Sequence, residues 1–317
     1  MTARFRTILA LAIAAALLLG ACGDDTAAPA TAPPAAPAPA AATFPVDITT
    51  AGGSFRVATR PVRIVSLSPT ATEMLFAIGA GPQVAAVDDQ SNFPAEAPRT
   101  DLSGFTPNVE AIAGQRPDLV VVDRDSAGVV AALGQLAIPT AVLPAAATLD
   151  DVYAQIEQLG AATGNIGEAA ALVAQMRRDI AGVVAEAPAR PEPLTYFHEL
   201  DDTFYSVTSK TFVGALYTSV GLRNIADGAA GAGDYPQLSP EAVIQADPDL
   251  IFLADTKCCQ ESAETVAARP GWSGITAVRS GHVIALDDDV ASRWGPRVVD
   301  LLRQIVAAVK AVPVAVG

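Results

Sequence analysis

Two stretches of this chain, EAIAGQRPDL at residues 110–119 and EAVIQADPDL at residues 241–250, repeat one pattern. In each stretch a glutamate is followed seven residues later by Pro-Asp-Leu. Thr106-Pro107 and Ser239-Pro240 stand upstream and predict an N-cap with a proline at the first helical position. The apolar runs at 119–122 and 250–253 predict strands buried on both faces. The repeat therefore predicts two related α/β lobes, and a cleft between two lobes is a usual site for a small ligand.

Strands and helices alternate around both copies of the repeat, which predicts parallel sheets with right-handed crossovers. In the first lobe we expect a hairpin over 46–57, strands at 62–67, 84–87, 119–122 and 140–143, helices at 68–78 and 127–136, and a loop from 88 to 104. In the second lobe we expect strands at 194–198, 250–253 and 282–286, an extended or hairpin segment at 204–207, and helices at 209–220, 263–268 and 296–309.

Residues 149–187 differ from both lobes, because apolar residues recur there at helical spacing with no strand between them. The pattern breaks near Gly164-Asn165, and the second helix, 166–187, is the expected connector between the lobes. The whole chain then divides into a signal peptide at 1–21, a lipidated cysteine with an Ala/Pro-rich tether at 22–45, an N-terminal lobe at 46–148, connecting helices at 149–190 and a C-terminal lobe at 191–317.

The N-terminal segment has the features of an export signal. Arg4 and Arg6 precede an apolar stretch, 8–19, that is too short to span a membrane. The sequence LGAC at 19–22 resembles the lipobox of bacterial lipoproteins, in which cleavage before the cysteine leaves that residue lipidated. We therefore expect Cys22 to anchor the protein on the outer face of the cytoplasmic membrane. An ordinary signal peptide with a chance cysteine is the alternative.

Charge and cysteine content bear on the class of partner. The chain has 20 basic and 34 acidic residues, a net charge of −14, so a nucleic-acid partner is not expected. Cys258 and Cys259 are adjacent. They either form a strained vicinal disulfide, stay reduced and pack as small hydrophobes, or link to another molecule.

The sequence offers no catalytic set and no resident metal or cofactor site. His198 and His282 are its two histidines, fewer than a zinc or manganese receptor needs. Residues 271–275, GWSGI, only approach the G-x-S-x-G pattern of hydrolases. We therefore predict a protein that is not an enzyme.

Three segments carry a family resemblance: RIVSLSPTATE at 63–73, the two Glu…Pro-Asp-Leu tracts, and SRWGPR at 292–297. With them the chain resembles the substrate-binding proteins of ABC importers for cobalamin and ferric siderophores. The resemblance implies an α/β fold of two Rossmann-like lobes with parallel-rich sheets, joined by one long helix. It also implies docking of Glu110 and Glu241 into arginine pockets of an ABC permease that works with its ATPase. The alternative is that these acids only stabilise the dipole of their helices.

The ligand is expected at the carboxyl ends of the strands. One wall would comprise Ser68, Pro69, Thr70, the 88–93 loop with Phe93, Phe105 and Arg124-Asp125; the other would comprise His198, Glu199, Phe204, Ser209, Lys210, Tyr235, Lys257 and the 287–297 segment with Asp289, Arg293 and Trp294. Aromatic side chains in these loops would stack on a flat macrocycle or a catecholate.

The resemblance places Phe93, Phe105, Tyr235, Asp289 and Arg293 at ligand contacts of cobalamin-binding relatives. Those relatives carry tryptophans at the positions of Phe105 and Tyr235, which weakens the assignment of cobalamin.

Several of these residues have a second interpretation. Arg293, Arg297 and Lys257 would neutralise an anionic ferric chelate unless they pair with the acids at 287–289. Trp294 would equally suit the hydrophobic core. His198 would suit the end of a strand, with its ring nitrogens hydrogen-bonded within the protein.

These observations predict a lipid-anchored, monomeric receptor that captures a bulky metal chelate, cobalamin or a ferric siderophore, for an ABC permease. The alternatives are a sensor or adhesin of the same fold and a receptor for haem or a metal ion.

Overall fold

The computed structural model describes residues 43–229 and 233–314. The predicted signal peptide, the anchor Cys22 and nearly all of the tether lie outside these ranges. Within them, no helix combines the length and apolar character needed to cross a membrane.

Five parallel strands form the sheet of the N-terminal lobe. Their order across the sheet is β5 (Arg99–Leu102), β4 (Val84–Asp88), β3 (Ile64–Leu67), β6 (Leu119–Val122) and β7 (Thr140–Val142). The central strands β3 and β6 are buried along their whole length. In β6, Leu119 and Val121 pack on one face, and Val120 and Val122 on the other. The apolar run of the repeat is thus a strand covered on both sides, as predicted.

Helices cover both faces of this sheet. The face that includes Leu119 packs against α1 (Pro69–Ala77) and α4 (Leu149–Thr163). The opposite face packs against α2 (Val109–Gly114) and α3 (Val129–Gln135). The predicted hairpin is present as antiparallel strands β1 (Val46–Thr50) and β2 (Gly53–Val57), which contact α4 and β7.

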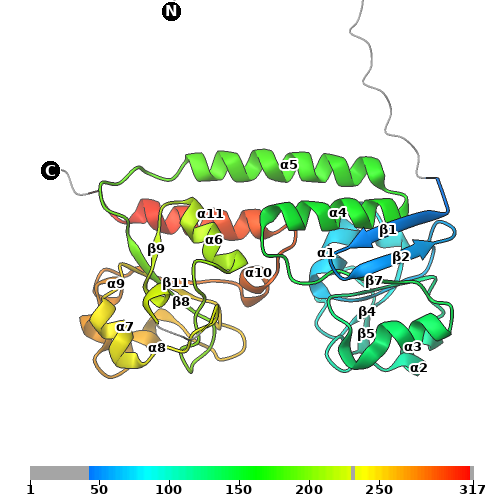
Figure 1. Cartoon of the computed structure of the whole chain (residues 1–317). Coiled ribbons are helices and arrows are strands. Elements are labelled where there is room, and N and C mark those ends of the chain that lie inside the picture. The colour runs from blue at the N-terminus through cyan, green and yellow to red at the C-terminus, as the bar shows by residue number, and fades with distance from the viewer. Residues whose placement is uncertain (1–42, 230–232, 315–317) are drawn as a thin grey trace, which may run out of the picture. The chain divides into compact units, whose positions relative to one another are not determined.

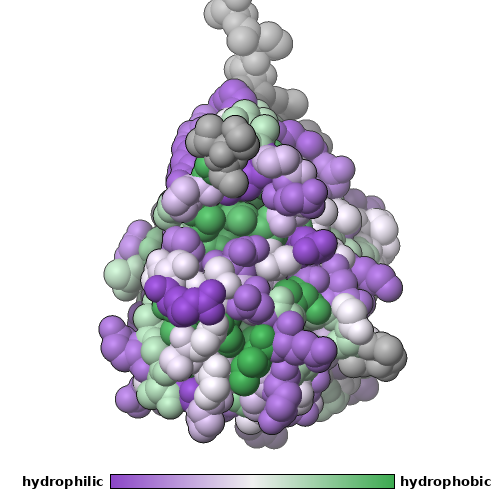
Figure 2. Space-filling model, turned by 90° about the vertical axis from the view of Figure 1, so that its left-hand side faces the viewer, coloured by the Kyte–Doolittle hydropathy of each residue, from purple (hydrophilic) through white to green (hydrophobic). Residues whose placement is uncertain are grey.

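A separate sheet of four parallel strands forms the C-terminal lobe. Its order is β11 (Val283–Ala285), β10 (Leu250–Leu253), β8 (Thr195–Glu199) and β9 (Arg223–Asn224). One face packs against α7 (Pro240–Ala246), α8 (Ala263–Ala268) and α9 (Thr276–Arg279), and the other against α6 (Phe212–Ser219) and α11 (Val298–Ala311). Figure 2 shows the outer side of this lobe, where small apolar groups lie between polar and charged residues.

The predicted connector is α5 (Ile166–Ala185), which runs alongside α4 of the first lobe and α11 of the second (Figure 1). The apolar faces of these helices belong to one continuous cluster of buried side chains that includes Met74 and Leu119 from one lobe and Tyr196 and Phe252 from the other. The two lobes therefore share a core through this helical layer although their sheets are separate.

The structure differs from the sequence predictions in several short elements. The start predicted for α2 at Thr106-Pro107 is wrong, because the side chain of Asn108 accepts the Ala111 N–H at 3.0 Å and caps the helix instead. In α7, Ser239 is the cap and Pro240 the first helical residue, as predicted. Glu110 and Glu241 still occupy the same place, two residues after their caps.

Other short elements were missed or misplaced. The loop predicted over 88–104 contains β5, and β9 was not predicted. Residues 204–207 form no strand, only an isolated bridge between Tyr205 and Gln237. A short helix, α10 (Asp288–Ser292), precedes α11, which begins two residues later than predicted.

Candidate functional site

Loops at the carboxyl ends of the two sheets meet at the segment from Asp287 to Arg297. The amide of Asn92, in the loop after β4, donates to the Asp289 carboxylate at 2.9 Å. Arg293 donates to the backbone oxygen of Gln90, in the same loop, at 3.0 Å. The two predicted walls are therefore in direct contact at this segment.

Glu73 of α1 is the centre of this contact between the lobes. Its carboxylate accepts hydrogen bonds from Arg293 Nη1 at 2.9 Å, Arg297 Nε at 2.9 Å and Arg297 Nη2 at 2.5 Å. The side chains are 2% exposed for Glu73, 9% for Arg293 and 19% for Arg297. The bonds to Glu73 raise the pKa of Arg297 further above its ordinary value. We call Glu73, Arg293 and Arg297 the interlobe clasp.

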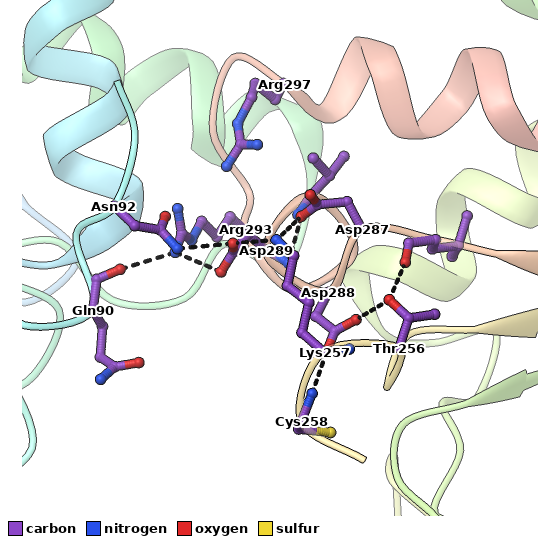
Figure 3. Close-up of polar contacts among 12 residues, drawn as sticks. Gln90, Asn92, Thr256, Lys257, Cys258, Asp287, Asp288, Asp289, Arg293 and Arg297 are labelled. Atoms are coloured by element: carbon purple, nitrogen blue, oxygen red, sulfur yellow. Dashed lines mark hydrogen bonds and ion pairs between the residues drawn. The ribbon is translucent and has the colours of Figure 1, made fainter. Parts of the chain in front are cut away.

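A second set of charges lies beside Arg293 and Arg297 of the clasp (Figure 3). The Asp289 carboxylate accepts from Lys257 Nζ at 2.6 Å and from Arg293 Nη2 at 2.7 Å, and Lys257 also reaches Asp287 at 2.8 Å. Burial alone would raise the pKa of Asp289, but the hydrogen bonds from Lys257 and Asn92 and the charge of Arg293 outweigh it and lower that pKa. Asp289 therefore remains ionised and paired.

The sequence left two interpretations of the cations, with either an anionic ligand or the acids at 287–289 as their partners. Lys257, Arg293 and Arg297 all bond to carboxylates of the protein. The sequence indicated pairing with the acids at 287–289, but it did not indicate Glu73, which binds both arginines. Glu73 ends the RIVSLSPTATE segment at 63–73. An acidic residue at a buried position of the predicted helix could have indicated that it needs a basic partner.

Ser68, Thr70 and His198, which were predicted to contact the ligand, are buried. Ser68 and Thr70 are 2% and 4% exposed, and the Ser68 hydroxyl caps α1 by accepting from the Ala71 N–H. His198 is fully buried, its Nδ1 lies 2.8 Å from the Tyr217 hydroxyl, and burial lowers its pKa to about 4. His198 is therefore a neutral side chain inside the C-terminal lobe and does not join the surface residues. Pro69 between the first two is half-buried.

Trp294 and Phe204 also make structural contacts. The indole Nε1 of Trp294 donates to Gln155 of α4 at 3.0 Å, and its ring packs against the shared core. Phe204 is half-buried with its ring 5.5 Å from that of Trp272. Trp294 thus adds a further contact between the lobes beside the clasp.

The exposed aromatic side chains of the described ranges are Phe93, Phe105, Tyr205 and Tyr235. Each lies in a loop that follows a strand or borders the edge where strands end. The guanidinium of Arg297 lies 4.4 Å from the centre of the Phe93 ring, so Phe93 adjoins the clasp. Tyr205 was not named from the sequence, although it lies in the predicted extended segment. These four rings offer apolar faces to a ligand.

A buried carboxylate pair lies deeper in the C-terminal lobe. Glu199 ends β8 and binds Arg269 through two hydrogen bonds, while Asp255, which follows β10, is fully buried and neither of its oxygens has a donor among the described residues. Burial and the charges of Glu199 and Glu261 raise the pKa of Asp255 to about 8. Asp255 is therefore protonated at neutral pH, when it can donate to Glu199.

Glu110 and Glu241 are exposed, and neither makes an ion pair with any residue of the described ranges. Their helices, α2 and α7, lie on the sides of their lobes remote from α5 (Figure 1). The two carboxylates are therefore available to a partner.

The structure also shows the state of the two adjacent cysteines and the grouping of side chains that could bind a metal ion. Cys258 and Cys259 are free thiols, the first exposed and the second half-buried. Across the described ranges, no three His, Cys, Asp or Glu side chains are grouped so as to hold a metal ion.

Comparison with known proteins gives concordant matches. A family model described as "Periplasmic binding protein" matches residues 64–290. A "Cobalamin-binding protein" of Halobacterium salinarum is 31% identical over 320 residues, which cover 96% of this chain and 84% of that protein. An "Uncharacterized ABC transporter substrate-binding lipoprotein YvrC" of Bacillus subtilis is 29% identical and covers 84% of this chain and 86% of its own.

Two solved structures share the fold. The periplasmic haem-binding protein RhuT from Roseiflexus sp. RS-1 superposes with a TM-score of 0.70 at 26% identity, covering 79% of this chain and 99% of that one. The periplasmic vitamin B12 binding protein BtuF of Vibrio cholerae superposes with a TM-score of 0.65 at 26% identity, covering 79% and 97%.

Glu73→Gln should destabilise the protein by about 3 kcal/mol, because it leaves the largely buried Arg297 without a counter-charge and leaves Arg293 paired with Asp289 alone. Denaturant unfolding followed by circular dichroism measures the change. Glu168→Gln is the matched control, since Glu168 is an exposed acid on α5. A loss below about 1 kcal/mol, the range of exposed pairs, would contradict the importance of the clasp.

Asp255→Asn should change how stability depends on pH. A carboxyl whose pKa rises on folding makes the folded state bind the extra proton, so its contribution to the free energy of unfolding falls as pH rises from about 4 towards 8. Relative to the wild type, the variant should therefore gain stability steadily between pH 5 and 8. Parallel unfolding titrations measure the difference, and a gap that is constant with pH would show that Asp255 is not protonated in the fold.

Proposed function

The chain belongs to the periplasmic binding protein family of ABC transporter substrate-binding proteins, and on that basis we propose that its ligand is cobalamin or a closely related corrinoid. The family consists of binding proteins and not enzymes. The protein would hold the corrinoid at the edge where its two sets of loops meet and release it to a permease.

The pairing of the cations is the observation that carries this choice of ligand. Lys257, Arg293 and Arg297 pair with three carboxylates, those of Glu73, Asp287 and Asp289. An anionic ferric chelate would have to displace these acids, and an arginine taken from a buried carboxylate leaves that carboxylate unpaired. A corrinoid with neutral amide side chains needs no such displacement.

The exposed aromatic rings support the same ligand. Phe93, Phe105, Tyr205 and Tyr235 supply apolar faces for a large, flat ring system, and polar groups of Asn92 and Asp289 lie at the same edge. The names of the relatives support the same ligand, because the Halobacterium protein and several bacterial ones are described as binding cobalamin or vitamin B12.

Haem is the second candidate, favoured by the exposed phenols of Tyr205 and Tyr235 and by the similarity to RhuT. A phenolate can serve as an axial ligand of haem iron. The propionates of haem, however, require cations, and those of the clasp are already paired.

Delivery would use Glu110 and Glu241. They occupy equivalent positions in the two lobes, lie exposed and have no ion-pair partner among the described residues. Two such carboxylates suit arginines or lysines on the two halves of a permease. Cys22, outside the described ranges, would hold the receptor at the outer face of the cytoplasmic membrane through its lipid.

Calorimetric titration should detect binding of cyanocobalamin and no binding of ferric hydroxamate or ferric catecholate chelates. Phe105→Ala and Tyr235→Ala should each weaken cobalamin binding by about tenfold, because each removes an aromatic contact. Leu136→Ala is the control, since Leu136 is an exposed apolar residue at the end of α3, outside the loops of the site.

Visible absorbance tests whether the protein binds haemin. Heat and a shifted Soret band with haemin, without a response to cobalamin, would assign the second candidate. Binding of the anionic ferric chelates alone would reject the argument from paired cations.

The double variant Glu110→Gln, Glu241→Gln should lose most cobalamin transport in proteoliposomes while keeping the cobalamin affinity of the wild type, because the two acids would contact the permease and not the ligand. Glu168→Gln is the control, since it removes an exposed acid from the first turn of α5 and has the same effect on a helix dipole. Equal transport by the double variant and this control would show that the two glutamates only stabilise the dipoles of their helices and do not contact the permease.

A further inference from the structure

Cys258 and Cys259 lie in the loop that follows β10, and none of the contacts assigned above requires their sulfurs. Both are free, and the first is exposed. Partial desolvation of its sulfur, the neighbouring Cys259 thiol and the Asp288 carboxylate raise the pKa of Cys258 to about 12. Cys258 is therefore accessible and largely protonated at neutral pH, and the Cys259 thiol is its direct neighbour.

The thiols belong to a tight turn that is held closed by backbone groups. The Cys259 N–H donates to the backbone oxygen of Asp255 at 3.1 Å, and the Cys258 sulfur lies 3.7 Å from the same oxygen. The turn is docked on one carboxylate: the N–H groups of Lys257 and Cys258 donate to Asp288 Oδ2 at 2.9 and 3.1 Å (Figure 3).

The same turn leads directly to the contact between the lobes. Lys257, which precedes the thiols, binds Asp287 and Asp289, and Asp289 accepts from Asn92 of the other lobe. A change in the turn therefore acts on the polar groups beside the interlobe clasp.

We propose that Cys258 and Cys259 form a reversible vicinal disulfide, by exchange with a small-molecule or protein disulfide, and that its closure opens the turn from Asp255 to Cys259. One cysteine thiolate attacks the external disulfide and releases one thiol, and the second cysteine then displaces the other. Two cysteine sulfurs are oxidised, the external disulfide is reduced to two thiols, and the two cysteine protons pass to those thiols.

Geometry links the bond to the turn. Neighbouring Cα atoms lie about 3.8 Å apart, below the roughly 4.4 Å at which disulfides begin to be common, so the peptide between the cysteines must rotate when the ring closes. The N–H of Cys259 belongs to that peptide and turns away from the Asp255 oxygen. An extracytoplasmic protein meets disulfides as oxidants. The inference does not depend on which chelate the protein binds.

The full chain, purified in detergent, is equilibrated in glutathione buffers of increasing oxidised fraction and digested with trypsin after acid quenching. Cleavage after Lys257 gives a fragment that begins at Cys258, and Pro270 prevents cleavage after Arg269, so the fragment runs to Arg279 and contains no other cysteine. We expect this fragment to lose the mass of two hydrogen atoms and to regain it with dithiothreitol. Cys258→Ser and Cys259→Ser are matched controls that can form only a mixed disulfide.

Hydrogen exchange on the same samples follows the turn. The amides of Lys257, Cys258 and Cys259 should exchange at least about tenfold faster in the oxidised form, as expected when hydrogen bonds, two of them to a carboxylate, are lost. A fragment that stays reduced or carries only glutathione overturns the proposal, and so does a closed disulfide with unchanged exchange at these amides.

Discussion

The pairing of Glu73 with Arg293 and Arg297 is the interaction on which the rest of the site depends. The Glu73 carboxylate is 2% exposed and therefore needs a counter-charge. Two guanidinium groups supply it, and both belong to a segment more than two hundred residues away in the other lobe. The clasp therefore brings the two sets of strand-end loops together. In the proposed function, the clasp also occupies the positive charge that an anionic ligand would need, which leaves shape and aromatic surface to select the ligand.

The clasp acts together with the helical layer formed by α4, α5 and α11. Because the apolar faces of these helices belong to one cluster of buried side chains, the lobes are joined by a packed core and not by a flexible strand or loop. Trp294 adds a polar contact to Gln155 in the same region. We expect lobes held in this way to have little freedom for large closure, so that the proposed ligand would meet an edge that is mostly formed in advance.

The sequence predicted the repeated helix–strand units, the two parallel sheets and the connecting helix, because each depends on a local periodicity in composition. It did not place Asn108 as the cap of α2, since Thr106-Pro107 presents an equally good local signal two residues earlier. The sequence also did not predict Glu73 as the partner of Arg293 and Arg297. An ion pair between residues so far apart in the chain leaves no pattern in the residues between them. The burial of His198 depends in the same way on helix α6 packing over its strand.

The distance between the two lobes tests most directly whether the interlobe clasp fixes their arrangement. Spin labels at Ala111→Cys and Ala242→Cys, two exposed positions on α2 and α7, would report it in a background where the three native cysteines are serine. We predict one narrow distance distribution that cobalamin leaves nearly unchanged and that Glu73→Gln broadens. A broad distribution with Glu73 intact, or one indifferent to the loss of Glu73, would contradict the claim that the buried clasp fixes the two lobes.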